Sequence, residues 1–259
     1  MRQFQIGLLI IIAGLLAGCP DPSQQTLRRG YDALEAKEYQ EAITRADEYL
    51  QQKPTGPGSA EALYLRGRGY EEKTAANPNE AAANLQAARA AYVDALKMGP
   101  PKLLEAYVRT SLANVAYFQD DFPVALQQWT NAYESLDRDD VRAWVLYRIG
   151  LSQQRLGQFD SADRTFGKVQ QTFPDTTPAV RSREHVGLRA FYVQVGVYSS
   201  ASSADKASAR IRQAGAVPAR FVDTRNRQVV RAGPFSSYTD ARAIRGRLLG
   251  AFPDAIIVP

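Results

Sequence analysis

The sequence predicts a multidomain protein in which an all-α solenoid of helical repeats is followed by an α+β domain with the ferredoxin-like order βαββαβ. Three observations predict this organisation. A pattern of small, aromatic and proline residues recurs about every 34 positions between residues 23 and 176. A different motif occurs twice between residues 188 and 259. The two regions also differ in charge, with a net charge of +7 over residues 188–259 and −3 over residues 20–187.

The first nineteen residues have the features of a bacterial lipoprotein signal. Arg2 precedes an apolar run over residues 6–16, which at about eleven residues is too short to cross a bilayer as a helix. The run leads into Leu16-Ala17-Gly18-Cys19, which resembles a lipobox, where the cysteine thiol is acylated and becomes the mature N-terminus. The resemblance implies a signal peptide over residues 1–18, a lipidated Cys19 with a short tether to residue 22, and attachment to a membrane. The alternative is an ordinary signal peptide or membrane anchor that happens to contain a cysteine.

The same resemblance bears on location in the cell envelope. Lipoproteins often carry Asp directly after the cysteine to remain at the inner membrane, but here Pro20 stands there and the aspartate is Asp21. We therefore expect the periplasmic side of the outer membrane in preference to the inner membrane. Because Cys19 is the only cysteine and His185 the only histidine, an internal disulfide and a Cys/His zinc site are excluded. No cofactor or metal is expected.

The repeated pattern is centred on four alanines, Ala42, Ala88, Ala125 and Ala162. Each of four features recurs in three copies. They are a small residue twelve places before the alanine, an aromatic residue three places before it, an aromatic residue four places after it, and a proline twelve places after it. Such prolines end helices. The pattern resembles the tetratricopeptide repeat (TPR), a pair of antiparallel helices whose apolar face only a neighbouring pair can cover.

The resemblance implies four repeats, over residues 23–56, 57–105, 106–139 and 143–176. The second repeat has about nine extra residues around positions 75–80, which displace its first helix, Ala60–Tyr70. The small residues should let two helices approach closely, and the aromatic four places after the alanine should fill the gap between neighbouring repeats. Residues 177–187 should form a capping helix or a linker, with Pro178 near its start.

A scaffold of this kind implies a concave groove that binds a protein partner, whose identity the sequence leaves open. Aromatic residues at helical spacing inside a repeat are more often packing residues than ligand contacts, so we assign no groove residues. The aromatics concerned are Tyr64, Tyr70, Tyr107, Tyr117, Trp129, Trp144 and Tyr147.

The motif that occurs twice in the C-terminal region is an alternating strand followed by a glycine, an aromatic residue and two serines. Its copies are Phe191–Ser200 and Gln228–Ser237. An amphipathic stretch follows each copy and predicts helices over about Ser203–Ala214 and Thr239–Leu249. The candidate N-cap residues of these helices are Ser203 or Asp205 and Thr239 or Asp240.

The rest of this region completes the ferredoxin-like order of strand, helix, strand, strand, helix, strand. Gly215 should end the first helix as a left-handed cap. Val217–Val222 reads as a strand, Asp223–Arg227 as a hairpin turn and Ala255–Val258 as a closing strand. Both helices must then cover one face of the sheet and leave the other open. Alternation along each strand predicts side chains toward the helices at Val193, Val195, Val230 and Ala232, and toward the open face at Tyr192, Gln194, Val229 and Arg231.

Two segments carry a resemblance to the SPOR domain over about 70 residues: Tyr192-Val-Gln-Val-Gly196 with Tyr198, and Val230-Arg-Ala-Gly-Pro-Phe235. SPOR domains bind peptidoglycan glycan strands that have lost their stem peptides, which accumulate where septal wall is split. The family often has Ser or Thr where Val197 stands and Arg where Val229 stands, which bears on affinity and not on the fold.

The resemblance implies a glycan-binding site of Tyr192, Gln194 and Arg231 on the open face. An amide, a guanidinium and an aromatic ring supply hydrogen bonds and stacking to a sugar chain, and attached peptides would block a flat approach, so selection of bare glycan can be steric. The alternative for Gln194 and Arg231 is a merely solvated sheet face. Tyr198 and Phe235 are expected to pack between strand and helix.

The sequence therefore predicts a non-enzymatic lipoprotein that binds denuded glycan through its SPOR domain and recruits a protein partner through its repeats, in cell division or wall remodelling. One alternative is a TPR scaffold lipoprotein of an outer-membrane assembly or secretion complex. Another is a hydrolase of the wall, although no nucleophile and base stand together in the sequence. The basic residues Arg220, Arg225, Arg227 and Arg231 also allow nucleic-acid binding, but we expect no nucleic-acid partner for a secreted lipoprotein.

Overall fold

The computed structural model describes residues 21–56 and 58–258. The predicted signal peptide and Cys19 lie outside these residues. The chain divides into two compact units, with the division between Ile149 and Gly150. None of the helices in the described part of the chain is both long and apolar enough to span a membrane.

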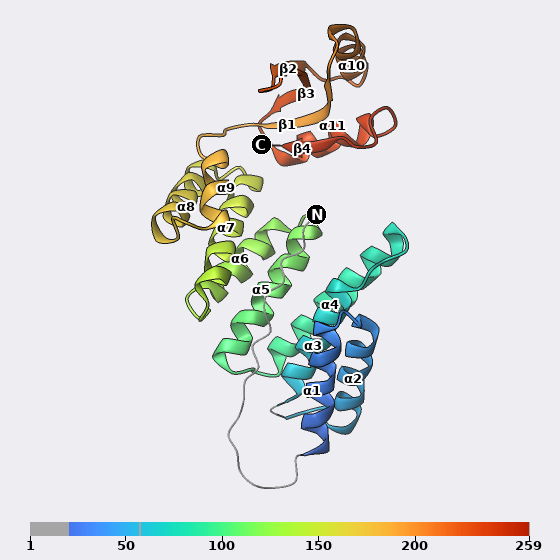
Figure 1. Cartoon of the computed structure of the whole chain (residues 1–259), viewed down its shortest axis with the longest axis vertical. Helices are drawn as coiled ribbons and strands as arrows, with labels where there is room; N and C mark the ends of the chain where they lie inside the picture. The colour runs from blue at the N-terminus through green and yellow to red at the C-terminus, as the bar shows by residue number, and fades with distance from the viewer. Residues whose placement is uncertain (1–20, 57, 259) are drawn as a thin grey trace. The chain divides into compact units, whose positions relative to one another are not determined.

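The repeat region is entirely helical (Figure 1). Its helices form four consecutive pairs followed by one further helix, in agreement with the predicted helical solenoid. The pairs are α1 (Pro22–Glu35) and α2 (Tyr39–Gln52), α3 (Ser59–Glu72) and α4 (Pro78–Lys97), α5 (Lys102–Phe118) and α6 (Phe122–Tyr133), and α7 (Asp139–Arg155) and α8 (Phe159–Thr172), and the further helix is α9 (Thr177–His185).

Small residues let the two helices of a repeat approach closely. A Cβ atom added at Gly67 in α3 would lie 2.3 Å from the ring of Tyr92 in α4, and one added at Gly150 in α7 would lie 2.5 Å from the ring of Phe166 in α8. In these two repeats the aromatic ring therefore packs against the glycine of its own repeat, where the sequence pattern had placed it between neighbouring repeats. Phe166 also contacts the helix that follows the repeats, because its ring centroid lies 5.3 Å from that of His185 in α9.

The extra residues of the second repeat lengthen a helix. Helix α4 has 20 residues, whereas α2, α6 and α8 have 14, 12 and 14. Asn77 caps the N-terminus of α4 by accepting a hydrogen bond of 3.0 Å from the backbone N–H of Glu80, and Pro78 occupies the first turn. Most of the insertion is thereby absorbed as regular helix, and the rest lengthens the connection between α3 and α4 over residues 73–77.

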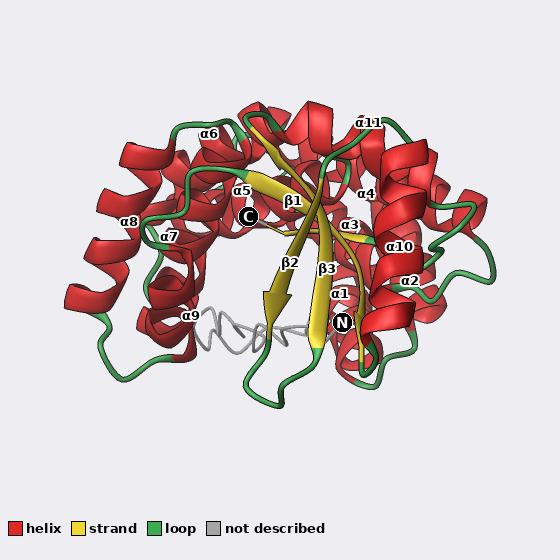
Figure 2. Ribbon diagram, turned by 90° about the horizontal axis from the view of Figure 1, so that it is seen from above, coloured by secondary structure: helices red, strands yellow, loops and turns green. Residues whose placement is uncertain are grey.

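The C-terminal region has the predicted order: β1 (Phe191–Tyr198), α10 (Ala201–Gln213), β2 (Pro218–Val222), β3 (Gln228–Phe235), α11 (Tyr238–Leu248) and β4 (Ile256–Val258). The four strands form one antiparallel sheet in the order β2-β3-β1-β4. Figure 2 shows β2 and β3 as neighbouring strands joined by a loop at one end.

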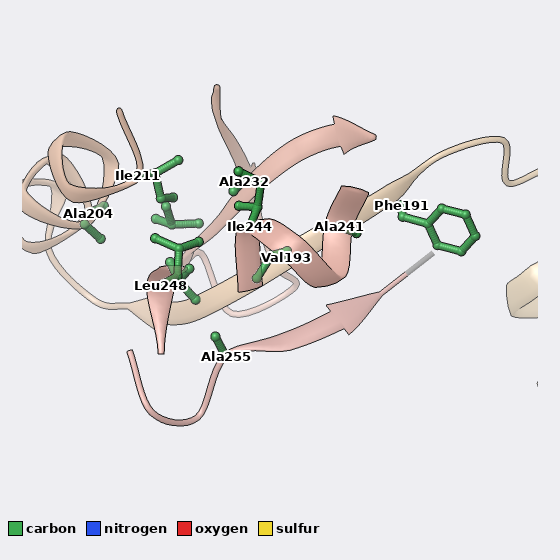
Figure 3. Close-up of a cluster of buried hydrophobic side chains, with 12 residues drawn as sticks. Phe191, Val193, Ala204, Ile211, Ala232, Ala241, Ile244, Leu248 and Ala255 are labelled. Carbon is green, nitrogen blue, oxygen red and sulfur yellow. The ribbon is translucent and has the colours of Figure 1, made fainter. Parts of the chain in front are cut away.

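One face of this sheet is covered by both helices. Half of their residues in the buried cluster are alanines, and the larger ones are Ile211, Ile244 and Leu248. These side chains meet Val193 and Ala232 of the strands (Figure 3). Small side chains allow the helices to lie close to the sheet. Tyr198 and Phe235 pack against the same cluster, as expected.

The helix caps differ from the sequence prediction. Both helices begin directly after the Ser-Ser pair, so the second serine of each pair is the N-cap. Ser200 accepts a hydrogen bond from the backbone N–H of Ser203, and Ser237 accepts one from that of Asp240. Ser203, Asp205, Thr239 and Asp240 therefore lie inside the helices and do not cap them. Gly215 follows α10 with φ = +80°, as predicted for a left-handed cap.

The close approach of α7 and α8 gives a stability prediction. Substituting Gly150→Ala forces a methyl group against the buried ring of Phe166, so we expect a loss of about 1–3 kcal/mol in the free energy of unfolding. Gly167→Ala in α8 is the matched control, because nothing lies within 4 Å of the added Cβ and alanine favours helix by up to about 1 kcal/mol. Urea denaturation measures both. Equal effects of the two substitutions would contradict this account of the packing.

Candidate functional site

The face of the C-terminal sheet opposite the helices, here called the open face, follows from the strand register. Residues directly opposite each other in an antiparallel pair project to the same side. Gln194 pairs with Arg231, which pairs with Ala219, and Gln194 also pairs with Ile256. Extending this register gives the side chains of the open face: Tyr192, Gln194, Val197, Ala219, Phe221, Val229, Arg231, Ile256 and Val258.

A register shift in β1 decides which side chains near the C-terminal end of this strand project to the open face. The pairing shifts between Gln194 and Gly196, as in a β-bulge. Beyond it, Val197 pairs with Val229 on the open face, while Tyr198 turns to the helical side and packs on the core. Strict alternation from Tyr192 would have put Tyr198 outside.

The three predicted site residues come together on this face around Arg231. Its Nε donates a hydrogen bond of 3.2 Å to Oε1 of Gln194. Its guanidinium carbon lies 5.9 Å from the ring centroid of Tyr192 and 4.9 Å from that of Phe221, within the range of cation–π attraction. The rings of Tyr192 and Phe221 are 5.8 Å apart at 89°, an edge-to-face contact. The sheet thus presents one cation held between an amide and two aromatic rings.

The electrostatic environment of Arg231 is unusual for a surface arginine. Partial burial lowers the pKa of its guanidinium from the ordinary value, because the charged form loses hydration. An arginine nevertheless stays protonated at neutral pH. Since the nine open-face residues include no Asp or Glu, the charge of Arg231 has no acidic counterpart on this face.

Phe221 is the site residue that sequence reasoning missed. It lies in the short edge strand β2, is 41% exposed, and contacts both Tyr192 and Arg231. The sequence predicts a strand over Val217–Val222 without assigning its faces, and the pairing of Phe221 with Val229 places this side chain on the open face. Val229 does lie on the open face as predicted, but its neighbours cover it to 9% exposure, so it offers little surface to a ligand.

The basic residues of this region do not form one patch. Arg220 projects to the helical side, where it pairs with Asp205 and donates to Oγ of Ser208 at 3.3 Å. Arg227 pairs with Asp223 at 2.7 Å in the hairpin turn. Arg225 also belongs to this turn, and of the two members of the group that lie in strands only Arg231 projects to the open face. The geometry therefore gives no support to the continuous basic surface that nucleic-acid binding requires.

In the repeats, the structure favours the packing interpretation for four of the seven aromatics considered. Tyr64, Tyr107, Trp129 and Tyr147 are buried. A polar path crosses these helices: Tyr92 donates to Glu71 at 2.5 Å, Asn114 reaches Glu71 at 3.5 Å, and Arg148 donates to Asn114 at 2.5 Å.

Burial shifts the pKa values of the two charged groups in this path. It raises the pKa of the Glu71 carboxyl and lowers that of the Arg148 guanidinium. These contacts join α3, α4, α5 and α7, which indicates a structural cross-link between repeats. Within residues 21–56 and 58–258, no cluster of His, Cys, Asp or Glu is arranged to hold a metal ion.

Comparisons with known proteins identify both regions. A protein-family model described as "SPOR domain" matches residues 187–259. This part of the chain is therefore a SPOR domain. A model described as "Tetratricopeptide repeat" matches residues 144–176, which cover most of α7 and all of α8. SPOR and TPR modules bind peptidoglycan and proteins respectively and are not themselves catalytic.

Solved structures similar to this chain include TPR proteins. MamA is 18% identical, with 59% of this chain and 79% of that chain covered and a TM-score of 0.47. A tetratricopeptide repeat protein from Parabacteroides merdae is 15% identical, with 62% and 57% covered and a TM-score of 0.49. YrrB, described as a TPR protein with an unusual peptide-binding site, is 16% identical, with 61% and 75% covered and a TM-score of 0.48. No curated protein matches the chain.

The β2–β3 hairpin that places Phe221 beside Arg231 depends on Asp223. Its carboxylate accepts hydrogen bonds from the backbone N–H of Arg225 at 2.9 Å and of Arg227 at 2.8 Å, and from Nε of Arg227 at 2.8 Å. The hydrogen bond from the Arg227 backbone is the largest cause that lowers the pKa of Asp223 below its ordinary value of 3.8. A carboxyl whose pKa is lower in the folded state stabilises that state when ionised, and loses this effect as the pH falls through the folded-state pKa.

We therefore expect Asp223→Asn to lower the unfolding midpoint of the SPOR domain near pH 7, because the charged acceptor is lost. The difference from the unmodified protein should shrink as the pH falls below about 4. Thermal unfolding followed by circular dichroism between pH 3 and 7 measures it. Asp254→Asn, at an exposed aspartate of the same domain, is the control. A pH-independent difference would show that the ionised carboxylate is not responsible.

Proposed function

We propose that the SPOR domain of this protein binds peptidoglycan glycan strands that lack stem peptides, through the open face of its sheet. The observation that carries this proposal is the group of Tyr192, Gln194, Phe221 and Arg231, which places hydrogen-bonding and aromatic groups side by side on an otherwise apolar surface. Sugar rings offer hydroxyl and acetamido groups at their edges and apolar faces for stacking. A surface with a single cation fits a sugar polymer with at most one charge per disaccharide better than a nucleic acid, which calls for many cations.

The TPR region is proposed to recruit a protein partner to the site that the SPOR domain binds. Solenoids of helix pairs present extended surfaces to partners. The polar path through Glu71, Asn114 and Arg148 ties consecutive repeats together, so that such a surface has a defined shape. Both modules act by binding, and together they support a scaffold and not an enzyme. We propose cell division or wall remodelling as the process served, because denuded glycan arises where wall is being cut.

The proposed glycan site is tested by pulling down full-length protein with peptidoglycan sacculi treated with an amidase that removes stem peptides. Phe221→Ala and Gln194→Ala should each weaken binding about two- to tenfold, the range expected when one hydrogen bond or stacking contact is lost. Val222→Ala is the matched control, because this residue is the neighbour of Phe221 in β2, is 59% exposed and projects to the other side. Equal binding to treated and untreated sacculi would overturn the proposal.

We also propose that the protein is a lipoprotein anchored through Cys19 on the periplasmic side of the outer membrane. The support is the lipobox-like sequence Leu16-Ala17-Gly18-Cys19. Each buried methylene of an acyl chain contributes about 0.8 kcal/mol to membrane binding, so several chains hold a protein firmly. An anchored protein reaches the wall from the membrane surface, which suits a wall-binding domain.

Substituting Cys19→Ser removes the acceptor of the lipid. We expect the variant to lose incorporation of radiolabelled palmitate and to move from the membrane fraction to the soluble fraction of the cell. Separation of inner and outer membranes on a density gradient then locates the unmodified protein. Persistent labelling of the serine variant would show that Cys19 is not the lipidated residue.

A further inference from the structure

The guanidinium of Arg231 has an unused hydrogen-bonding edge. Its Nε is occupied by Gln194, whereas Nη1 and Nη2 make no hydrogen bond or ion pair with any described residue. The two Nη groups of an arginine form a planar fork that matches a carboxylate, with two parallel N–H···O bonds. The two free Nη groups of Arg231 are therefore suited to bind an anion. A neutral hydroxyl group would need only one of these donors.

The surroundings hold this fork in place. Gln194 fixes one side of the guanidinium, and the rings of Tyr192 and Phe221 lie within 5.9 and 4.9 Å of its carbon. A side chain restrained in this way loses less conformational entropy when it binds a ligand than a freely rotating one does. None of the nine open-face residues is acidic, so none of them repels an incoming carboxylate.

The chemistry of the proposed ligand supplies such a carboxylate. In intact peptidoglycan the lactyl group of each N-acetylmuramic acid is joined to the stem peptide by an amide bond. Hydrolysis of that bond consumes one water, releases the peptide with a free amine and leaves a carboxylate on the lactyl group. Stripping the peptide thus converts one neutral amide in each disaccharide into one negative charge.

We propose that Arg231 binds the lactyl carboxylate of denuded glycan through Nη1 and Nη2, so that this domain recognises the charge that peptide removal creates. This inference rests on the proposed glycan-binding function and names the group that gives it specificity. It differs from purely steric selection, in which bare glycan binds only because no peptide is in the way. Electrostatic selection makes the lactyl charge necessary, whereas steric selection does not.

The test removes the charge of the lactyl group and leaves the shape of the glycan almost unaltered. Denuded glycan oligosaccharides are prepared with an amidase, and part of the material is converted so that each lactyl carboxylate becomes a methylamide. Isothermal titration calorimetry then compares both with the full-length protein. We expect the methylamide form to bind at least about tenfold more weakly, the scale of losing one charge-assisted pair, and the preference for the carboxylate form to fall as salt is added.

Two variants assign the effect to Arg231. Arg231→Gln should bind both oligosaccharides with similar affinity, and Arg231→Lys should retain part of the preference, since it keeps the charge and loses the fork. Arg212→Gln on α10 removes the same charge from the helical side and should keep the full preference. Circular dichroism checks that each variant is folded.

The outcomes separate this inference from the proposed function. If the unmodified protein binds both oligosaccharides equally well, the inference is wrong and steric selection stands, while glycan binding itself remains. If Arg231→Gln discriminates as well as the unmodified protein does, another group reads the carboxylate and the assignment to Arg231 fails. If neither oligosaccharide binds at all, the proposed glycan-binding function fails as well.

Discussion

The pairing of β1 with β3 is the constraint on which the proposed site depends. It brings Gln194 opposite Arg231, 37 positions apart in the sequence, and thereby makes the hydrogen bond that orients the guanidinium. A slip of one residue in this pairing would send either side chain toward the helices, because successive residues of a strand project to opposite faces. The buried residues Val193 and Ala232, which pair in the same register, oppose such a slip because it would expose them.

The same strands give the two faces of this sheet different properties. On the helical side, alanines at the inward positions of α10 and α11 bring the helices close and exclude water from the core. Among the nine strand residues of the open face, Arg231 is the only charged one. Arg220 adjoins Arg231's neighbour Ala219 in β2, but it projects to the helical side and is neutralised there by Asp205. The charge of the open face is therefore concentrated on a single residue.

The helical repeats solve a different packing problem. Glycines such as Gly67 and Gly150 remove the side chain that would separate two helices, and the rings of Tyr92 and Phe166 fill the space. An insertion that lengthened a loop would have left backbone groups to be satisfied by water or side chains. The part of the insertion that lies in α4 has these groups satisfied by helical hydrogen bonds, and Tyr92 still packs against Gly67.

The sequence by itself determined the features that depend on local periodicity. The helix pairs follow from recurring small and aromatic residues, the βαββαβ order from the duplicated motif, and the common face of Gln194 and Arg231 from alternation along β1 and β3. Only the tertiary structure decided the features that depend on strands brought together from different parts of the chain. These are the place of Phe221 beside Arg231, the bulge in β1 that lets Tyr198 reach the helical side, and the diversion of Arg220 to Asp205. The physical reason is that a side chain's face is set by its own strand, whereas its neighbours, and so its charge balance and accessibility, are set by strands paired across the sheet.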